Sequence, residues 1–144
     1  MIPISDINPA KNTPYVTRVF ILFTAAVYLL VQPKTSSDLF NFFYEFSAIP
    51  CEIQKGYPLS ANQFYKNNCF ASIDGVIFNE KNLLMSLITA NFLHANLLHL
   101  VGNLWSFWIF GNNIEDKLGI FKFNIFLILA AGGLSLIHIS EPTR

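Results

Sequence analysis

Residues 89–119 read TANFLHANLLHLVGNLWSFWIFGNNIEDKLG, and this stretch decides the predicted fold. It holds most of a run of 33 residues, between Lys81 and Glu115, that contains no Asp, Glu, Lys or Arg. With about 100° of rotation per helical residue, four of its polar residues fall within an arc of roughly 80°. They are Asn96, His99, Asn103 and Ser106. Because lipid offers no hydrogen-bond partners, such a stripe must face protein or enclosed water, which predicts a membrane helix near residues 95–111.

The polar stripe allows two interpretations. His99 and Asn103 are four residues apart, so they share a helix face, and both can donate hydrogen bonds. Two converging donors in a water-limited cavity suit the stabilisation of an oxyanion. The alternative is helix-to-helix packing, with roughly 0.6–2 kcal/mol per contact, and spacing alone favours it. A metal or haem site at His94 and His99 is the weakest interpretation, because five-residue spacing splays the rings and no HExxH pattern is present.

Three other residues of this stretch receive structural roles. Gly102 is expected to allow a close backbone approach beside Asn103. Trp105 and Trp108 precede a charged segment, so packing or an interfacial belt is expected of them.

Further apolar segments lie on both sides. Val19–Val31 (VFILFTAAVYLLV) carries no charge and predicts a first spanning helix near residues 15–32. Residues 123–133 (FNIFLILAAGG) predict the beginning of a third helix, and residues 115–122 (EDKLGIFK) are expected to form a short charged turn before it. Residues 1–14, with three prolines and no helical period, predict an extended arm.

Residues 33–82 are expected to form a long loop on the far side of the membrane. Their aromatic clusters predict short helices that lie at the membrane interface. The loop holds both cysteines, Cys51 and Cys69. A disulfide is expected if the loop is exported, and two free thiols are the equal alternative.

The composition excludes several classes of protein. Of 144 residues, 53% are hydrophobic and only 12% are charged, and nine basic residues balance nine acidic ones. A disordered chain needs more charge, and a nucleic-acid binder needs a basic excess, so no nucleic-acid partner is expected. An integral, multi-pass membrane protein of the all-α class, with the lipid bilayer as its surroundings, fits best.

The last eleven residues, 134–144, read LSLIHISEPTR. They match the in-frame translation of a transposon-type sequencing adapter, so we expect them to be an artefact and the third membrane helix to be truncated. Ser135, His138, Ser140 and Glu141 are therefore left out of every catalytic argument.

The distribution of basic residues predicts the orientation. Lys11 and Arg18 flank the start of the first helix, and Lys117 and Lys122 lie in the predicted short turn, whereas four lysines are spread over the long loop. The positive-inside rule then places the amino terminus in the cytoplasm and residues 33–82 outside.

At this point the sequence resembles a known family. FLHANLLHLVGNLWSFWIFGNNIEDKLG looks like the second transmembrane helix and following loop of the rhomboid intramembrane serine proteases. The opening, MIPISDINPAKNTPYVTRVFILFTAAVYLLV, is similar to the start of bacterial rhomboids. The resemblance covers roughly residues 1–32 and 83–133, and it departs from the family where Met85 and Ser86 stand near a frequent Trp-Arg pair.

The resemblance implies a rhomboid-like helical bundle in a bacterial-type inner or plasma membrane. It implies cleavage of transmembrane protein substrates by a Ser–His dyad, without metal or organic cofactor. His99 and Asn103 match the pair that binds the oxyanion, and His94 matches an upstream histidine with a less direct role. The nucleophilic serine of a Gly-x-Ser-Gly motif and the general-base histidine are absent from this chain, which is expected to be inactive by itself. An inactive relative that binds or traffics membrane clients is the alternative.

Overall fold

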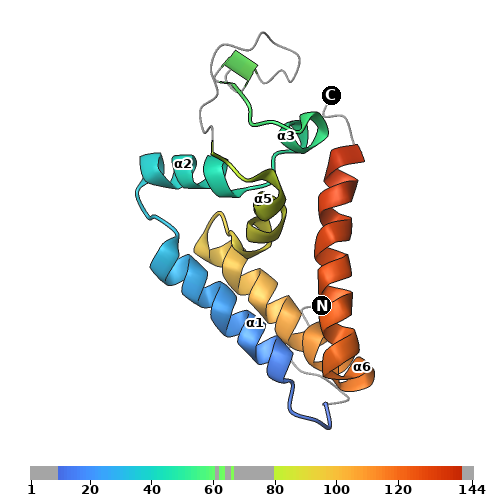
Figure 1. The fold of residues 1–144 in the computed structure, drawn as a ribbon. Coiled ribbons are helices and arrows are strands. Elements are labelled where there is room, and N and C mark those ends of the chain that lie inside the picture. Colours follow the sequence, from blue (N-terminus) through green and yellow to red (C-terminus); the bar gives the residue numbers. More distant parts are fainter. Residues whose placement is uncertain (1–9, 61, 64–65, 67–79, 141–144) are drawn as a thin grey trace. The chain divides into compact units, whose positions relative to one another are not determined.

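The computed structural model describes residues 10–60, 62–63, 66 and 80–140, and the side chains of residues 134–140 lie outside that description (Figure 1). Every element with defined bounds in this part of the chain is a helix, as the all-α prediction requires. The elements are α1 (Tyr15–Ala26), η1 (Val27–Val31), α2 (Ser36–Phe46), α3 (Pro50–Lys55), α5 (Leu83–Thr89), η2 (Ala90–Phe92) and α6 (Leu97–Ser140).

The chain divides into two compact units. The first comprises Met1–Gln32 with Phe92–Ala130, and the second comprises Pro33–Asn91 with Ala131–Arg144. The first unit carries the sequence stripe and is built on α1 and the beginning of α6. The second contains the short helices α2, α3 and α5.

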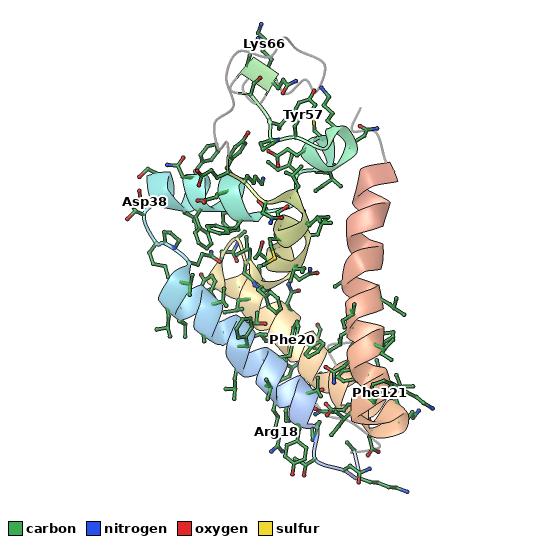
Figure 2. All side chains as sticks on the ribbon, in the orientation of Figure 1. Arg18, Phe20, Asp38, Tyr57, Lys66 and Phe121 are labelled. Carbon is green, nitrogen blue, oxygen red and sulfur yellow. The ribbon has the colours of Figure 1, made fainter. Side chains whose placement is uncertain are left out.

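In the first unit, α1 and the beginning of α6 pack antiparallel. Thr17, at the start of α1, bonds to Glu115 of α6, and Phe20 stacks on Phe107 with ring centroids 4.6 Å apart. At the other end, Gln32 bonds to His94, just before α6. Figure 2 shows Phe20 directed from α1 toward α6. The packed face of α6 therefore recurs at helical spacing, with Leu100, Gly111 and Glu115 buried on it.

A carboxylate from α6 caps the start of α1. The residue before the helix is Pro14, which makes no side-chain capping bond. Instead, the Glu115 carboxylate accepts the N–H groups of Val16 at 2.9 Å and Thr17 at 2.8 Å, and the Thr17 hydroxyl at 2.8 Å. Unpaired N–H groups and the positive end of the helix dipole both favour an anion there. Glu115 is only 4% exposed, and these three donors take the place of water around its carboxylate.

The neighbouring acid holds the arm that precedes α1. Asp116 accepts the backbone N–H groups of Lys11 at 3.2 Å and Asn12 at 2.9 Å, and the Asn12 amide at 2.7 Å. The two consecutive acids therefore fix the arm and the start of α1 against α6.

The close approach of the two helices occurs at Gly111. A Cβ atom there would lie 3.1 Å from both Cγ2 and Oγ1 of Thr17. At Gly102, where the sequence predicts the close approach, a Cβ atom would meet nothing within 4 Å. That prediction is wrong, because Gly102 lies on the exposed side of α6 and Gly111 lies on the packed side.

The predicted turn at residues 115–122 corresponds to a break inside α6, where two helices are joined across a kink at Gly119, whose φ of 73° and ψ of 163° are not helical. The break is shorter than predicted, because the residues on both sides of Gly119 are helical. Glu115 and Asp116 lie in the helix before the kink and pair with donors of the amino-terminal segment. Beyond the kink, Phe123 is fully buried against Phe107 and Phe126.

The second unit packs around Tyr44, Cys51, Leu59 and Ile49. Cys51 is disulfide-bonded, so the free-thiol alternative is wrong for this residue, and Cys69 lies outside the described residues. The fully buried Glu52 forms an ion pair with Lys81, whose ammonium also donates to the Tyr44 carbonyl at 2.7 Å. Burial, with Glu52 close by, raises the pKa of the Tyr44 phenol to about 12.

The helices were compared with the length and hydropathy of membrane spans. Among the described residues, no single helix qualifies, and Tyr15–Val31 is an apolar helix of shorter length. Two helices joined at a bend, Leu83–Phe92 and Leu97–Gly133, reach the length and hydropathy of a membrane span when they are taken together.

We expect Glu115→Ala to lower the free energy of unfolding by about 3 kcal/mol, because the part-buried N–H of Val16 and the buried N–H of Thr17 lose their acceptor. Glu115→Gln keeps one carbonyl oxygen, so its free energy of unfolding should lie between those of the unchanged protein and Glu115→Ala. Thermal unfolding in detergent micelles, followed by helical circular dichroism, measures the loss. The exposed acid Glu45 of α2 supplies the control, and a Glu115→Ala protein as stable as Glu45→Ala would contradict the capping role.

Lys81→Met should destabilise the second unit by roughly 3–5 kcal/mol, because it leaves the Glu52 charge buried without its cation. Adding Glu52→Gln should restore most of that loss, since no buried charge remains. Hydrogen exchange at the Leu59 amide, which donates to Glu52 at 3.0 Å, reports this locally. Equal destabilisation of the single and double variants would refute a role for the charge itself.

Candidate functional site

The candidate site lies at the start of α6. His99, Asn103 and Ser106 are all exposed in the described part of the chain. His99 and Asn103 remain one turn apart on the helix, and Asn103 lies one turn before Phe107, which contacts Phe20 of α1. The polar stripe that the sequence predicts is therefore exposed and borders the face that packs on α1.

Asn96 does not belong to the stripe as predicted. It precedes the first residue of α6, and its side-chain oxygen accepts the backbone N–H of His99 at 2.9 Å. This is the ordinary capping role of asparagine at a helix start. The helical spacing predicts Asn96 on the stripe only if the helix begins before Leu97, and it does not.

His94 also differs from its predicted placement. Five-residue spacing on one helix predicts that the rings of His94 and His99 splay apart, but His94 lies in the turn before the helix begins. The two rings are edge to face, with centroids 5.4 Å apart and an interplanar angle of 67°. His94 is 4% exposed and its Nδ1 lies 3.2 Å from the Phe92 carbonyl oxygen.

The sequence analysis missed Gln32. Its side-chain amide accepts the His94 N–H at 3.2 Å and donates to the His94 carbonyl at 2.6 Å. Gln32 is 4% exposed and ends η1, 62 residues before its partner. The signal that the sequence offers for it is a glutamine directly after an apolar run, and its burial is seen in the structure.

Other features of the described residues lie away from the stripe. A pocket of about 520 Å³ opens at the opposite end of the helix pair, lined by Asn12, Thr13, Pro14, Tyr15, Glu115, Asp116, Gly119 and Ile120. No group of three or more His, Cys, Asp and Glu side chains in the described part is placed to hold a metal ion. Trp105 and Trp108 are 46% and 42% exposed on α6.

The comparisons with known proteins bear on the same part of the chain. The family model described as "Rhomboid domain" matches residues 81–141, which include α5, the turn at His94 and all of α6. No curated protein and no solved structure matches the chain. The family model covers His94, His99 and Asn103, so the family assignment does not depend on the similarity of the amino-terminal segment. The resemblance seen in the sequence is thereby confirmed over residues 81–141, the part of the chain that matches the rhomboid domain.

Proposed function

We propose that this chain is the amino-terminal part of an intramembrane serine endopeptidase that cleaves transmembrane proteins. The observation that carries the proposal is the exposed pair His99 and Asn103, on α6 and inside the matched rhomboid domain. Packing glue, the competing interpretation of the stripe, would use these side chains against a neighbouring helix. In the described part of the chain both side chains are exposed instead, which supports a role for the pair outside the contact between α1 and α6.

The chemistry proposed for the pair is stabilisation of an oxyanion. The Asn103 amide and one ring N–H of His99 would donate to the oxygen that becomes negative when a serine attacks the peptide carbonyl. Such a donor contributes roughly 2.7–4 kcal/mol to transition-state stabilisation. The serine and the histidine that takes its proton are proposed to come from native sequence in place of residues 134–144. This dyad needs no metal or organic cofactor.

The proposed topology has α1 with η1, and α6, inside the bilayer, with a cytoplasmic amino terminus. The disulfide at Cys51 supports an exported second unit, because oxidising compartments preserve such bonds. The aromatic residues Phe40 and Phe46 of α2 are exposed at 52% and 37%. They suit a helix that lies at the membrane interface, with α2 on the outer side.

The second candidate function is that of an inactive relative that binds or traffics membrane clients. It shares the fold, so helix packing does not separate the two candidates. The His99 and Asn103 pair favours the enzyme, because a protein that only binds clients does not need two donors for an oxyanion.

In the protein encoded by the uninterrupted gene, we expect His99→Ala and Asn103→Ala each to lower kcat by about 10²–10³-fold, because each removes one oxyanion donor. KM should change little, since the donors act mainly in the transition state. The measurement is cleavage of a fluorescent transmembrane substrate in liposomes.

Asn124→Ala is the matched control, because Asn124 lies on α6 and its amide donates within that helix, to the Ile120 carbonyl at 2.8 Å. Membrane insertion of each variant is checked by resistance to carbonate extraction. If the His99 and Asn103 variants both cleave as fast as the control, the stripe is a packing surface and the proposed role is wrong.

A further inference from the structure

Gln32 binds both backbone groups of one residue far away in the sequence. The His94 N–H donates to Oε1, and Nε2 donates to the His94 carbonyl. A side-chain amide presents a donor and an acceptor side by side, so it can bond to the N–H and the carbonyl of one residue, as a neighbouring β-strand does. Both residues are 4% exposed, and either one alone would leave buried polar groups unpaired. The pair therefore fixes the turn at His94 to the end of the first helix.

The end of that helix has an unusual geometry at this position. Residues Val27–Val31 form a π-helical turn, and the Gln32 N–H donates to the Val27 carbonyl at 2.9 Å. A π turn adds about one residue to an α-helix, so it rotates the residues that follow it by roughly 100°. Such turns are uncommon and occur often at functional sites. Gln32 directly follows this turn, and its side chain bonds to His94.

Gln32 binds the turn before α6, and two residues of this turn contact His99. Asn96, in this turn, accepts the His99 backbone N–H at 2.9 Å. His94, in the same turn, places its ring edge to face with the His99 ring. The backbone and the imidazole of His99 therefore both depend on residues 93–96.

The protonation of His94 follows from its neighbours. A carbonyl oxygen only accepts hydrogen bonds, so the contact between Nδ1 and the Phe92 carbonyl requires the proton on Nδ1. Burial lowers the pKa of His94, the Phe92 carbonyl opposes this shift, and the nearby His99 adds to it. The neutral Nδ1–H ring results, and its orientation is set by the backbone that Gln32 clamps.

We propose that Gln32 is a positioning residue for His99, acting through the backbone and ring of His94. Gln32 touches no reacting atom, and it fixes the direction in which the His99 imidazole can donate. The role of His99 as a donor to an oxyanion rests on the proposed function. The coupling among Gln32, His94 and His99 does not depend on that function, because it is a property of the chain itself.

The first test measures this coupling without activity. The chain is labelled with ¹⁵N at histidine, placed in detergent micelles, and its three imidazoles are assigned with His94→Gln and His99→Gln. In the unchanged chain we expect His94 to be the Nδ1–H tautomer and to titrate below the ordinary histidine pKa of about 6.5. In Gln32→Met, His94 should lose the single tautomer and titrate closer to 6.5, and the His99 ring signals should move as well.

Thr24→Val is the matched control. Thr24 is buried on the same helix at 1% exposure, and its hydroxyl has no hydrogen-bond partner in the described part of the chain. The control should leave both histidine signals unchanged. Gln32→Glu is the second variant, because it keeps an oxygen for the His94 N–H and should disturb the signals less than methionine does. If Gln32→Met does not fold, a shift of the His99 signals in Gln32→Glu supports the proposal. Unchanged His99 signals in a folded Gln32 variant overturn it.

The second test separates this proposal from the proposed function. In the protein from the uninterrupted gene, Gln32→Met should lower kcat about tenfold with KM unchanged, because a small misplacement of a catalytic donor is costly. Combined with His99→Ala, it should cause no further loss. If His99→Ala slows cleavage and Gln32→Met does not, the positioning role fails and the oxyanion role stands. If His99→Ala itself has no effect, the proposed function fails, whereas the histidine signals still decide the coupling.

Discussion

The first unit depends on one carboxylate. Glu115 satisfies the unpaired N–H groups at the start of α1, and its burial is tolerable only because three donors surround it. This contact fixes the antiparallel register of α1 and α6, and the close approach at Gly111 follows from it. Once one end is fixed by Glu115 and the other by Gln32, the rotation of α6 about its own axis is determined.

That rotation decides which residues are available for chemistry. With Leu100, Gly111 and Glu115 turned toward α1, His99 and Asn103 are exposed. The turn before α6 then adds precision, because Asn96 fixes the helix start and His94 abuts the His99 ring. A hydrogen-bond donor for a transition state must be held in place before the reaction, and this arrangement holds one of the two candidates.

Much of the helical organisation could be predicted from the sequence, whereas its contacts could not. The uncharged run at Val19–Val31 lies within α1 and η1, because an uninterrupted apolar run of this length favours a helix. The charged run at Glu115 predicts a turn, and α6 does break inside that run, at Gly119. A sequence does not reveal that Glu115 itself stays helical and caps the start of another helix. The predictions for Asn96 and His94 treat both residues as helical, whereas the helix begins at Leu97, and helix boundaries are the least certain part of a periodic pattern. The role of Gln32 could not be predicted from the sequence, because its side chain bonds to the backbone of His94, and any residue type supplies the same backbone groups.

The most direct test of the central claim, that His99 and Asn103 serve an intramembrane serine protease, is the nucleotide sequence of the native gene read across the codon for Gly133. The account predicts that residues 134–144 are replaced by further membrane helices, with a Gly-x-Ser-Gly motif about one helix downstream and a histidine two helices later. Native reads that end at Arg144, or that continue through helices without such a serine, would contradict it.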